Sequence, residues 1–302
     1  MPPTSDTVTH VPEPVFSGVR ADLPVPDARL TYWDTRRPGP TVVLLHPHTG
    51  NGAVWAHQHA KFAARGYRTV SYSRRGHWPS ETTPRSVADT QHTENTENTA
   101  ATAPSGADDL EALRVELGLE RLHLVGAALG GAYAVDYALR FPARVATMTL
   151  ASSLAGIRGA GTLPPGWDDL PAAVQELGPV YRAADPAGTR RYAELTSLPR
   201  PAVPQPLTSA GTVAALAELS VPTLVVAGGA DPYQPPPKAR ELARHIARAE
   251  LVVLPEAGHV GFWEFPRLFN EAVLEFLDRH RDQPNSRCNA AQRRPHSTEP
   301  AT

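Results

Sequence analysis

The hydrophobic pattern of the chain alternates between short apolar runs and segments with helical spacing. Runs such as TVVLL (41–45) and TLVVAG (223–228) are nearly continuous, which is typical of strands covered on both faces. Between such runs lie segments, such as 53–67, whose apolar residues recur every three or four positions. Because strands that alternate with helices form parallel sheets, the pattern predicts an α/β protein with a mostly parallel, doubly wound sheet.

The predicted elements cover most of the chain, and one long polar stretch separates them. Residues 81–106, rich in Thr, Asn and Glu, are expected to form a surface loop. The spacing predicts strands at 28–35, 41–46, 67–73, 122–127, 145–153, 223–231 and 250–255, and helices at 53–67, 108–119, 129–142, 236–247 and about 262–280.

The alternation breaks down between residues 154 and 219, where Pro, Gly and Arg are frequent and the helical pieces are short. An insertion of this length between two core strands is predicted to cover the carboxyl edge of the sheet, where ligands bind in open α/β sheets. We therefore expect a flexible N-terminus (1–13), a first part of the core (14–153), a cap or lid insertion (154–219), a second part of the core (220–280) and a disordered tail (281–302).

Composition excludes several classes of function. The chain has 302 residues, 41% of them hydrophobic, but its apolar runs are far shorter than the roughly 20 residues that a membrane-spanning helix needs. A net charge of −2 and the lack of a basic stripe argue against nucleic acid as a partner. The N-terminus lacks the pattern of a signal peptide and Cys288 is the single cysteine, so we expect a cytoplasmic protein.

The segment VGAALGG (125–131) lies between a predicted strand and a predicted helix, where a G-x-S-x-G turn would carry a nucleophilic serine. Gly126 and Gly130 are retained, because a side chain at either position would clash in so sharp a turn. Position 128 holds alanine. Asp231 and His259 follow at strand ends, in the order nucleophile, acid, histidine that such a triad requires.

With these residues in place, the chain resembles the α/β-hydrolase fold family over about residues 16–280. The resemblance implies an acid at Asp231, a base at His259, and an oxyanion hole made by the backbone N–H groups of His48 and Leu129. It also implies a cap insertion before the strand that carries the acid.

Two motifs depart from the family pattern. In LLHPHTG (44–50), Pro47 replaces the usual glycine, although the N–H lost there is not one that the oxyanion hole uses. In SYSRRGHWPS (71–80), Ser73 and Trp78 replace the aspartate and a glycine of the D-x-R-G-x-G-x-S turn, which leaves the packing of that turn open.

Ala128 rules out an acyl-enzyme, since a methyl group cannot attack a carbonyl carbon. Three interpretations follow. In the first, His259 and Asp231 act without covalent catalysis, as in a lyase, cyclase, decarboxylase or direct hydration. In the second, the chain is a Ser→Ala inactivated form of a Ser-His-Asp hydrolase of esters, lactones or C–C bonds. In the third, it is a non-catalytic protein that binds a small ligand.

Other candidate residues are open to simpler explanations. The H-x-H pairs formed by His46 and His48 and by His57 and His59 lack the further ligands of a zinc site, so no metal is expected. The glycine-rich turn lacks the residues of a phosphate loop, and no cofactor is expected. The expected partner is a small-molecule substrate, and the sequence does not indicate an oligomeric state. Candidates to contact the substrate are Trp167, Tyr181, Arg190, Arg191 and Tyr192.

Overall fold

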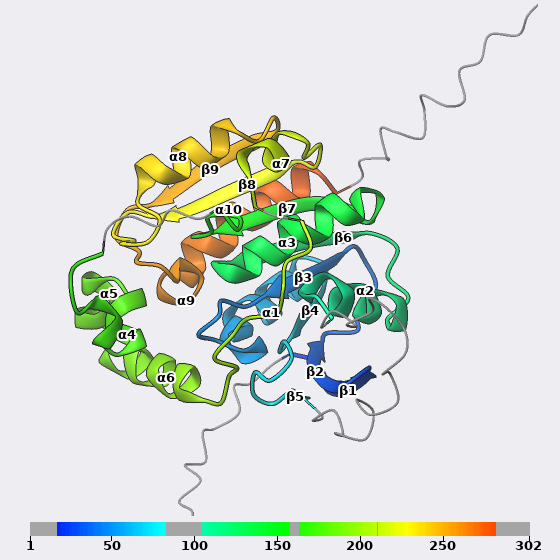
Figure 1. The fold of residues 1–302 in the computed structure, drawn as a ribbon, viewed down its shortest axis with the longest axis horizontal. Coiled ribbons are helices and arrows are strands. Elements are labelled where there is room, and N and C mark those ends of the chain that lie inside the picture. Colours follow the sequence, from blue (N-terminus) through cyan, green and yellow to red (C-terminus); the bar gives the residue numbers. More distant parts are fainter. Residues whose placement is uncertain (1–16, 83–103, 158–162, 210, 282–302) are drawn as a thin grey trace, which may run out of the picture.

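The computed structural model describes residues 17–82, 104–157, 163–209 and 211–281, and these form an α/β fold around one sheet (Figure 1). The strand order is β1-β2-β4-β3-β6-β7-β8-β9, with β5 paired to β2. From β4 to β9 neighbouring strands are parallel, whereas β1, β2 and β5 pair antiparallel at one edge. The strands are β1 (Val19–Val25), β2 (Ala28–Asp34), β3 (Thr41–Leu45), β4 (Arg68–Tyr72), β5 (Glu81–Thr82), β6 (Leu122–Ala127), β7 (Val145–Ala151), β8 (Thr223–Gly228) and β9 (Ala249–Leu254).

Helices cover both faces of this sheet, which confirms the predicted fold class. Two separate clusters of buried apolar residues result, one on each face. The central strands β3, β6 and β8 are buried along their whole length because both of their faces are covered. On one face lie α2 (Gly106–Glu116), α3 (Leu129–Arg140), α7 (Val213–Ala217) and α8 (Pro236–Arg244), and on the other lie α1 (Ala56–Ala64), α9 (Gly261–Glu264) and α10 (Pro266–Arg279).

Some element boundaries differ from the predicted ones for local reasons. The expected helix 262–280 is broken into α9 and α10 at Phe265, because Pro266 disfavours a helical conformation in the residue before it. Helix α2 begins at Gly106 rather than at 108, since Ser105 and Asp108 form a capping box. Strands β1 and β5 were not predicted. Of the expected polar loop, residues 83–103 lie outside the described part of the chain.

Between β7 and α7 the described residues include the helices α4 (Ala172–Glu176), α5 (Pro179–Ala184) and α6 (Pro186–Ser197), which we call the insert helices. Figure 1 shows them grouped on one side of the molecule, away from the helices that cover the sheet. They contact one another chiefly through α6. The expected flexible N-terminus and all but the first residue of the expected tail lie outside the described residues.

In the part of the chain that the structure describes, no helix is both long and apolar enough to cross a membrane.

Candidate active site

Ala128 occupies a sharp turn between β6 and α3 and has an unusual backbone conformation. Its φ is 48° and its ψ is −115°, which a residue with a Cβ adopts only at a cost. A Cβ on Gly126 would lie 2.5 Å from the carbonyl oxygen of Gly130, and one on Gly130 would lie 2.1 Å from that of Leu45. The turn therefore has the tight strand-to-helix geometry that the sequence predicted, with a methyl group at its apex.

Asp231 and His259 come together at the carboxyl ends of β8 and β9. The Nδ1 of His259 lies 3.0 Å from both carboxylate oxygens of Asp231. Because an ionised carboxylate only accepts hydrogen bonds, Nδ1 carries the proton and Nε2 is left as the basic nitrogen. Asp231 is itself fixed by the N–H groups of Tyr233 (2.8 Å) and Gln234 (3.1 Å).

The two side chains shift each other's pKa. Burial alone would lower the pKa of His259, but the charge and hydrogen bond of Asp231, together with the charges of Glu176 and Glu264, raise that pKa above its usual 6.5. Burial likewise disfavours the Asp231 carboxylate, yet the charge and hydrogen bond of His259 hold the pKa of Asp231 below its ordinary value. A histidine stabilised in this way can accept a proton and hold it as an imidazolium, which is the role of a general base.

Residues 46–50 follow β3 and pass beside the turn at Ala128. The two oxyanion donors expected from the sequence are the N–H of His48, in this loop, and the N–H of Leu129, the first residue of α3. The N–H groups of a first helical turn have no acceptor within the helix, so that of Leu129 is available to an anion. Below the loop, the Nε2 of His77 lies 3.1 Å from the carbonyl oxygen of His48.

The two substitutions in the turn 71–80 are accommodated by hydrogen bonds. The Oγ of Ser73 accepts the N–H of Gly52 at 2.9 Å and donates to the carbonyl oxygen of Trp78 at 2.9 Å. Arg75 forms a buried, bidentate pair with Asp109 at 2.6 and 2.7 Å. The turn thus keeps its position beneath the loop of His48.

The backbone around His259 is bound to the insert helices. Glu264, which is 4% exposed, accepts the N–H groups on either side of His259 at 3.0 and 3.3 Å, and also the N–H of Gly178 at 2.7 Å. The N–H of His259 donates to the carbonyl oxygen of Glu176 at 2.7 Å. Burial raises the pKa of Glu264 to about 7. The sequence analysis did not identify Glu264, although an acidic residue in the apolar segment GFWE could have drawn attention to it.

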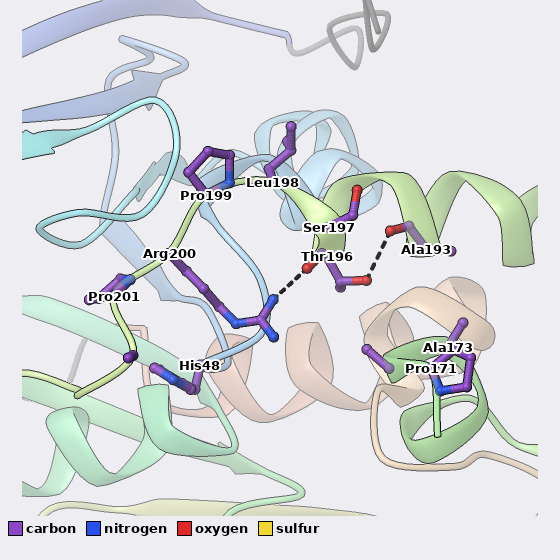
Figure 2. A pocket seen from close by; sticks show the side chains of 12 residues that line it. His48, Pro171, Ala173, Ala193, Thr196, Ser197, Leu198, Pro199, Arg200 and Pro201 are labelled. Carbon is purple, nitrogen blue, oxygen red and sulfur yellow. Dashed lines mark hydrogen bonds between the residues drawn. The ribbon is translucent and has the colours of Figure 1, made fainter. Parts of the chain in front are cut away.

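A cavity of about 740 Å³ lies between the insert helices and the loop of His48 (Figure 2). Arg200 extends over it and donates to the carbonyl oxygen of Thr196 at 2.5 Å. Burial and the charges of Arg74 and Arg200 lower the pKa of His48, so its imidazole is neutral. The lining residues are His48, Pro171, Ala172, Ala173, Ala193, Thr196, Ser197, Leu198, Pro199, Arg200, Pro201 and Ala202.

The residues proposed to contact substrate lie outside the lining of this cavity. Tyr192 is fully buried and donates to the carboxylate of Glu176, while Tyr181 donates to Asp185 at 3.1 Å. Arg190 and Arg191 are exposed.

Trp167 is linked to the side chains of the dyad through Tyr233. Its indole N–H donates to the hydroxyl oxygen of Tyr233 at 2.9 Å, and the ring of Tyr233 lies 4.6 Å from that of His259. Sequence reasoning missed Tyr233, because its position beside His259 depends on how the chain turns after Asp231.

The H-x-H pair of His57 and His59 packs against neighbouring side chains. His59 is buried, with its Nε2 2.9 Å from the hydroxyl of Ser71, and His57 packs edge-on against Trp263. Among the residues described, no three His, Cys, Asp or Glu side chains are grouped as metal ligands would be.

The sheet, the strained turn and the Asp–His pair define a class: α/β enzymes that place a catalytic turn at the carboxyl edge of a parallel sheet. Comparison with known proteins agrees, because residues 42–272 match the model of the alpha/beta hydrolase family. The chain belongs to this family.

Individual relatives are hydrolases. The chain is 27% identical to a 2-hydroxy-6-oxononadienedioate/2-hydroxy-6-oxononatrienedioate hydrolase of Burkholderia vietnamiensis, over 91% of this chain and the whole of the relative. It is 29% identical to a hydrolase of Pseudomonas putida named for the same compounds, over 83% of this chain and 92% of the relative. A thermophilic esterase from Thermogutta terrifontis has a similar fold, with a TM-score of 0.68 and 22% identity over 87% of this chain and 99% of the esterase.

Proposed function

We propose that the site is built for the hydrolysis of a small ester, lactone or ketone C–C bond by Ser-His-Asp chemistry, and that the chain with Ala128 is its inactivated form. The observation that supports this most strongly is the backbone of Ala128. A strained φ of 48° is retained at the apex of the turn, where alanine gains nothing from it but a serine would be held toward the substrate.

Each residue has a defined role in this reaction. The Nε2 of His259 removes the proton from the attacking hydroxyl and later returns it to the leaving group. Asp231 holds the Nδ1 proton and stabilises the imidazolium, and the N–H groups of His48 and Leu129 bind the oxyanion. With a methyl group at 128 the carbonyl can still bind and be polarised, but no acyl-enzyme forms.

Membership in a family of hydrolases favours this interpretation over the other two. The first interpretation, a lyase or related enzyme without covalent catalysis, gains no support from the hydrolases that the chain resembles. The third, a binding protein, leaves unexplained why the pair of His259 and Asp231 keeps a geometry suited to proton transfer.

The insert helices are proposed to be the cap, with the cavity beside His48 forming part of the substrate site. Its volume of about 740 Å³ lies in the range of pockets that hold small molecules. Of the candidates from the sequence, Trp167 is the best placed to contact a substrate, through its link to Tyr233. Tyr181 and Tyr192 are proposed to hold the insert helices in shape, and Arg190 is a candidate only for a substrate that reaches the surface.

Restoring the nucleophile tests the proposal. Ala128→Ser is assayed beside the unmodified chain on short and medium acyl esters, thioesters, lactones and a 2-hydroxy-6-oxononadienedioate. Because loss of the nucleophile costs on the order of a millionfold in turnover, we expect the variant to gain at least about a thousandfold on one substrate class.

The double variant Ala128→Ser/His259→Ala is the control and should lose this gain. If the serine variant is folded and no faster than the unmodified chain on the whole panel, the site is not that of a hydrolase.

A further inference from the structure

Arg74 is a buried cation beneath the loop of His48. Its side chain is 1% exposed, and among the described residues no carboxylate lies within ion-pairing distance of it. Its neighbour Arg75 differs, since it is neutralised by Asp109. The guanidinium of Arg74 instead lies over the ring of Tyr133, 5.0 Å from the centroid. Burying an unpaired charge is costly, so its retention calls for a role.

The hydrogen bonds that Arg74 donates go to the loop that carries the expected oxyanion donor, while its own carbonyl oxygen accepts the N–H of His77. Its side chain donates to the carbonyl oxygen of His46 and, at 3.1 Å, to that of Pro47. Its backbone N–H donates to the Nε2 of His46 at 3.0 Å. This bond makes Nε2 an acceptor, so the Nδ1 of the neutral ring carries the proton and donates to the carbonyl oxygen of Pro47 at 2.7 Å.

The carbonyl of Pro47 and the N–H of His48 belong to the same peptide group. Hydrogen bonds to a peptide oxygen, above all from a charged donor, draw electron density toward that oxygen and strengthen the N–H as a donor. Arg74 therefore acts, through one planar peptide, on the N–H that is expected to bind the oxyanion.

The surroundings keep Arg74 as the dominant local charge. Burial lowers the pKa of Arg74 to about 10, so the guanidinium stays protonated at neutral pH. Burial and the charge of Arg74 together lower the pKa of His46, His48 and His77, so these three rings are neutral. The loop thus lies against the buried positive charge of Arg74, whereas Arg200, the other cation that acts on His48, is exposed.

We propose that Arg74 is a positioning residue for the oxyanion hole, which orients and polarises the Pro47–His48 peptide toward the negative charge that forms on the substrate oxygen. This inference rests on the proposed hydrolase function. Arg74 touches the loop and not the substrate, so its effect belongs to the transition state, where that oxygen becomes charged.

The test compares Arg74→Met and Arg74→Lys, each combined with Ala128→Ser, with Ala128→Ser alone. We expect Arg74→Met to lower kcat about tenfold with KM nearly unchanged, because only the charged transition state is affected. Affinity for a trifluoromethyl ketone, which forms an oxyanion adduct with the introduced serine, should fall by the same factor, while affinity for the matching methyl ketone should not. Arg74→Lys keeps the charge and should recover part of the loss.

Arg140→Met is the matched control, since Arg140 lies at the opposite end of α3 from Ala128 and pairs with Asp108 near the surface. It should leave kcat and both ketone affinities unchanged. An unchanged kcat in Arg74→Met, or an equal loss of affinity for both ketones, would overturn the proposal. If Arg74→Met does not fold, the affinities of Arg74→Lys for the trifluoromethyl ketone and the methyl ketone are compared in the same way.

A second readout needs no activity. In the unmodified chain, Arg74→Met should raise the pKa of His48 in an NMR titration, because a nearby positive charge is removed. An unmoved pKa would contradict the electrostatic role even if Ala128→Ser proves inactive. Inactivity of Ala128→Ser with a raised His48 pKa would overturn the proposed hydrolase function and leave the charge effect standing.

Discussion

At the scale of the residue, the proposed site differs from a complete hydrolase triad by the one oxygen atom that Ala128 lacks. The turn at Ala128 is strained, and His259 and Asp231 form a hydrogen-bonded pair. The nearby departure from the family pattern at Ser73 is accommodated, because its hydroxyl accepts the N–H of Gly52 and donates to the carbonyl oxygen of Trp78. We therefore propose that the missing oxygen is not part of a wider loss of the site.

The strain at Ala128 predicts that Ala128→Gly raises the free energy of unfolding by about 1 kcal/mol. Glycine relieves a backbone cost of about 1–3 kcal/mol at φ 48° and loses about 0.5–1 kcal/mol through its greater freedom in the unfolded chain. Ala132→Gly, within α3, is the control and should lower stability by about 1 kcal/mol. Urea unfolding of both variants measures these changes. A lower free energy of unfolding at both positions would show that Ala128 is not strained.

Residues with a fixed motif could be predicted from the sequence, and residues that depend on packing could not. Gly126, Asp231 and His259 lie where the motif and chain order place them. Arg74 and Glu264 were missed, because charged side chains are normally exposed and no local pattern shows that these two are buried.

At the scale of the element, the insert helices and the loop of His259 form one hydrogen-bonded unit. Glu176 and Gly178 come from the insert, and their backbone groups bond to His259 and Glu264 respectively. A Cβ on Gly178 would come within 2.9 Å of the backbone at Gly258, so the two segments are in close contact. Movement of the insert helices would therefore shift the backbone of His259.

Tyr192 and Tyr181 offer a matched pair of substitutions within the insert helices. Tyr192→Phe removes the hydroxyl that donates to the buried carboxylate of Glu176 and should lower the free energy of unfolding by about 2 kcal/mol. Tyr181→Phe removes a bond to the half-buried Asp185 and should cost less than about 1 kcal/mol. Urea midpoints test this order. Equal losses of stability in the two variants would contradict the structural role of Tyr192. A change at Tyr192 confined to KM in the Ala128→Ser background would assign Tyr192 to the substrate instead.

The elements that could be predicted are those buried on both faces. Strands such as β3 and β8 are continuous apolar runs, so their pattern alone identifies them. The edge strand β1, VRADLPV, was missed because it is mostly exposed and carries Asp22 and Pro24 within its length. The insert helices are short and were anticipated only as irregular helical pieces, since contacts with the core determine their arrangement.

At the scale of the whole molecule, the buried carboxylate of Glu264 makes stability depend on pH. Its pKa rises from 4.5 to about 7 on folding, so between these values the folded state binds a proton that the unfolded state releases. Stability from this group is therefore fully present below pH 4.5 and falls as pH rises through 7, by about 3 kcal/mol.

Glu264→Gln should remove this dependence. Urea unfolding between pH 5 and 8 is expected to show a smaller fall in stability with rising pH for Glu264→Gln than for the unmodified chain. Glu271→Gln, on the exposed side of α10, is the control and should keep the original slope. Parallel slopes for all three proteins would show that Glu264 is ionised throughout this range.

The molecule as a whole brings three distant segments to one edge of its sheet: the turn after β6, the acid after β8 and the histidine after β9. Figure 1 shows the insert helices to one side of these strands. The parallel order of the strands made this meeting predictable, because the carboxyl ends of parallel strands share an edge. The cavity and the cap residues that shape it depend on tertiary packing, which is why the substrate contacts proposed from the sequence lie outside its lining.

The most direct test of the account is covalent labelling of Ala128→Ser by a fluorophosphonate, followed by intact-protein mass spectrometry. We predict one adduct per chain on the introduced serine, no adduct on the unmodified chain, and much slower labelling when His259→Ala is added. Folded Ala128→Ser that takes up no label, or labels equally fast without His259, would contradict the claim that this site is a serine hydrolase lacking only its nucleophile.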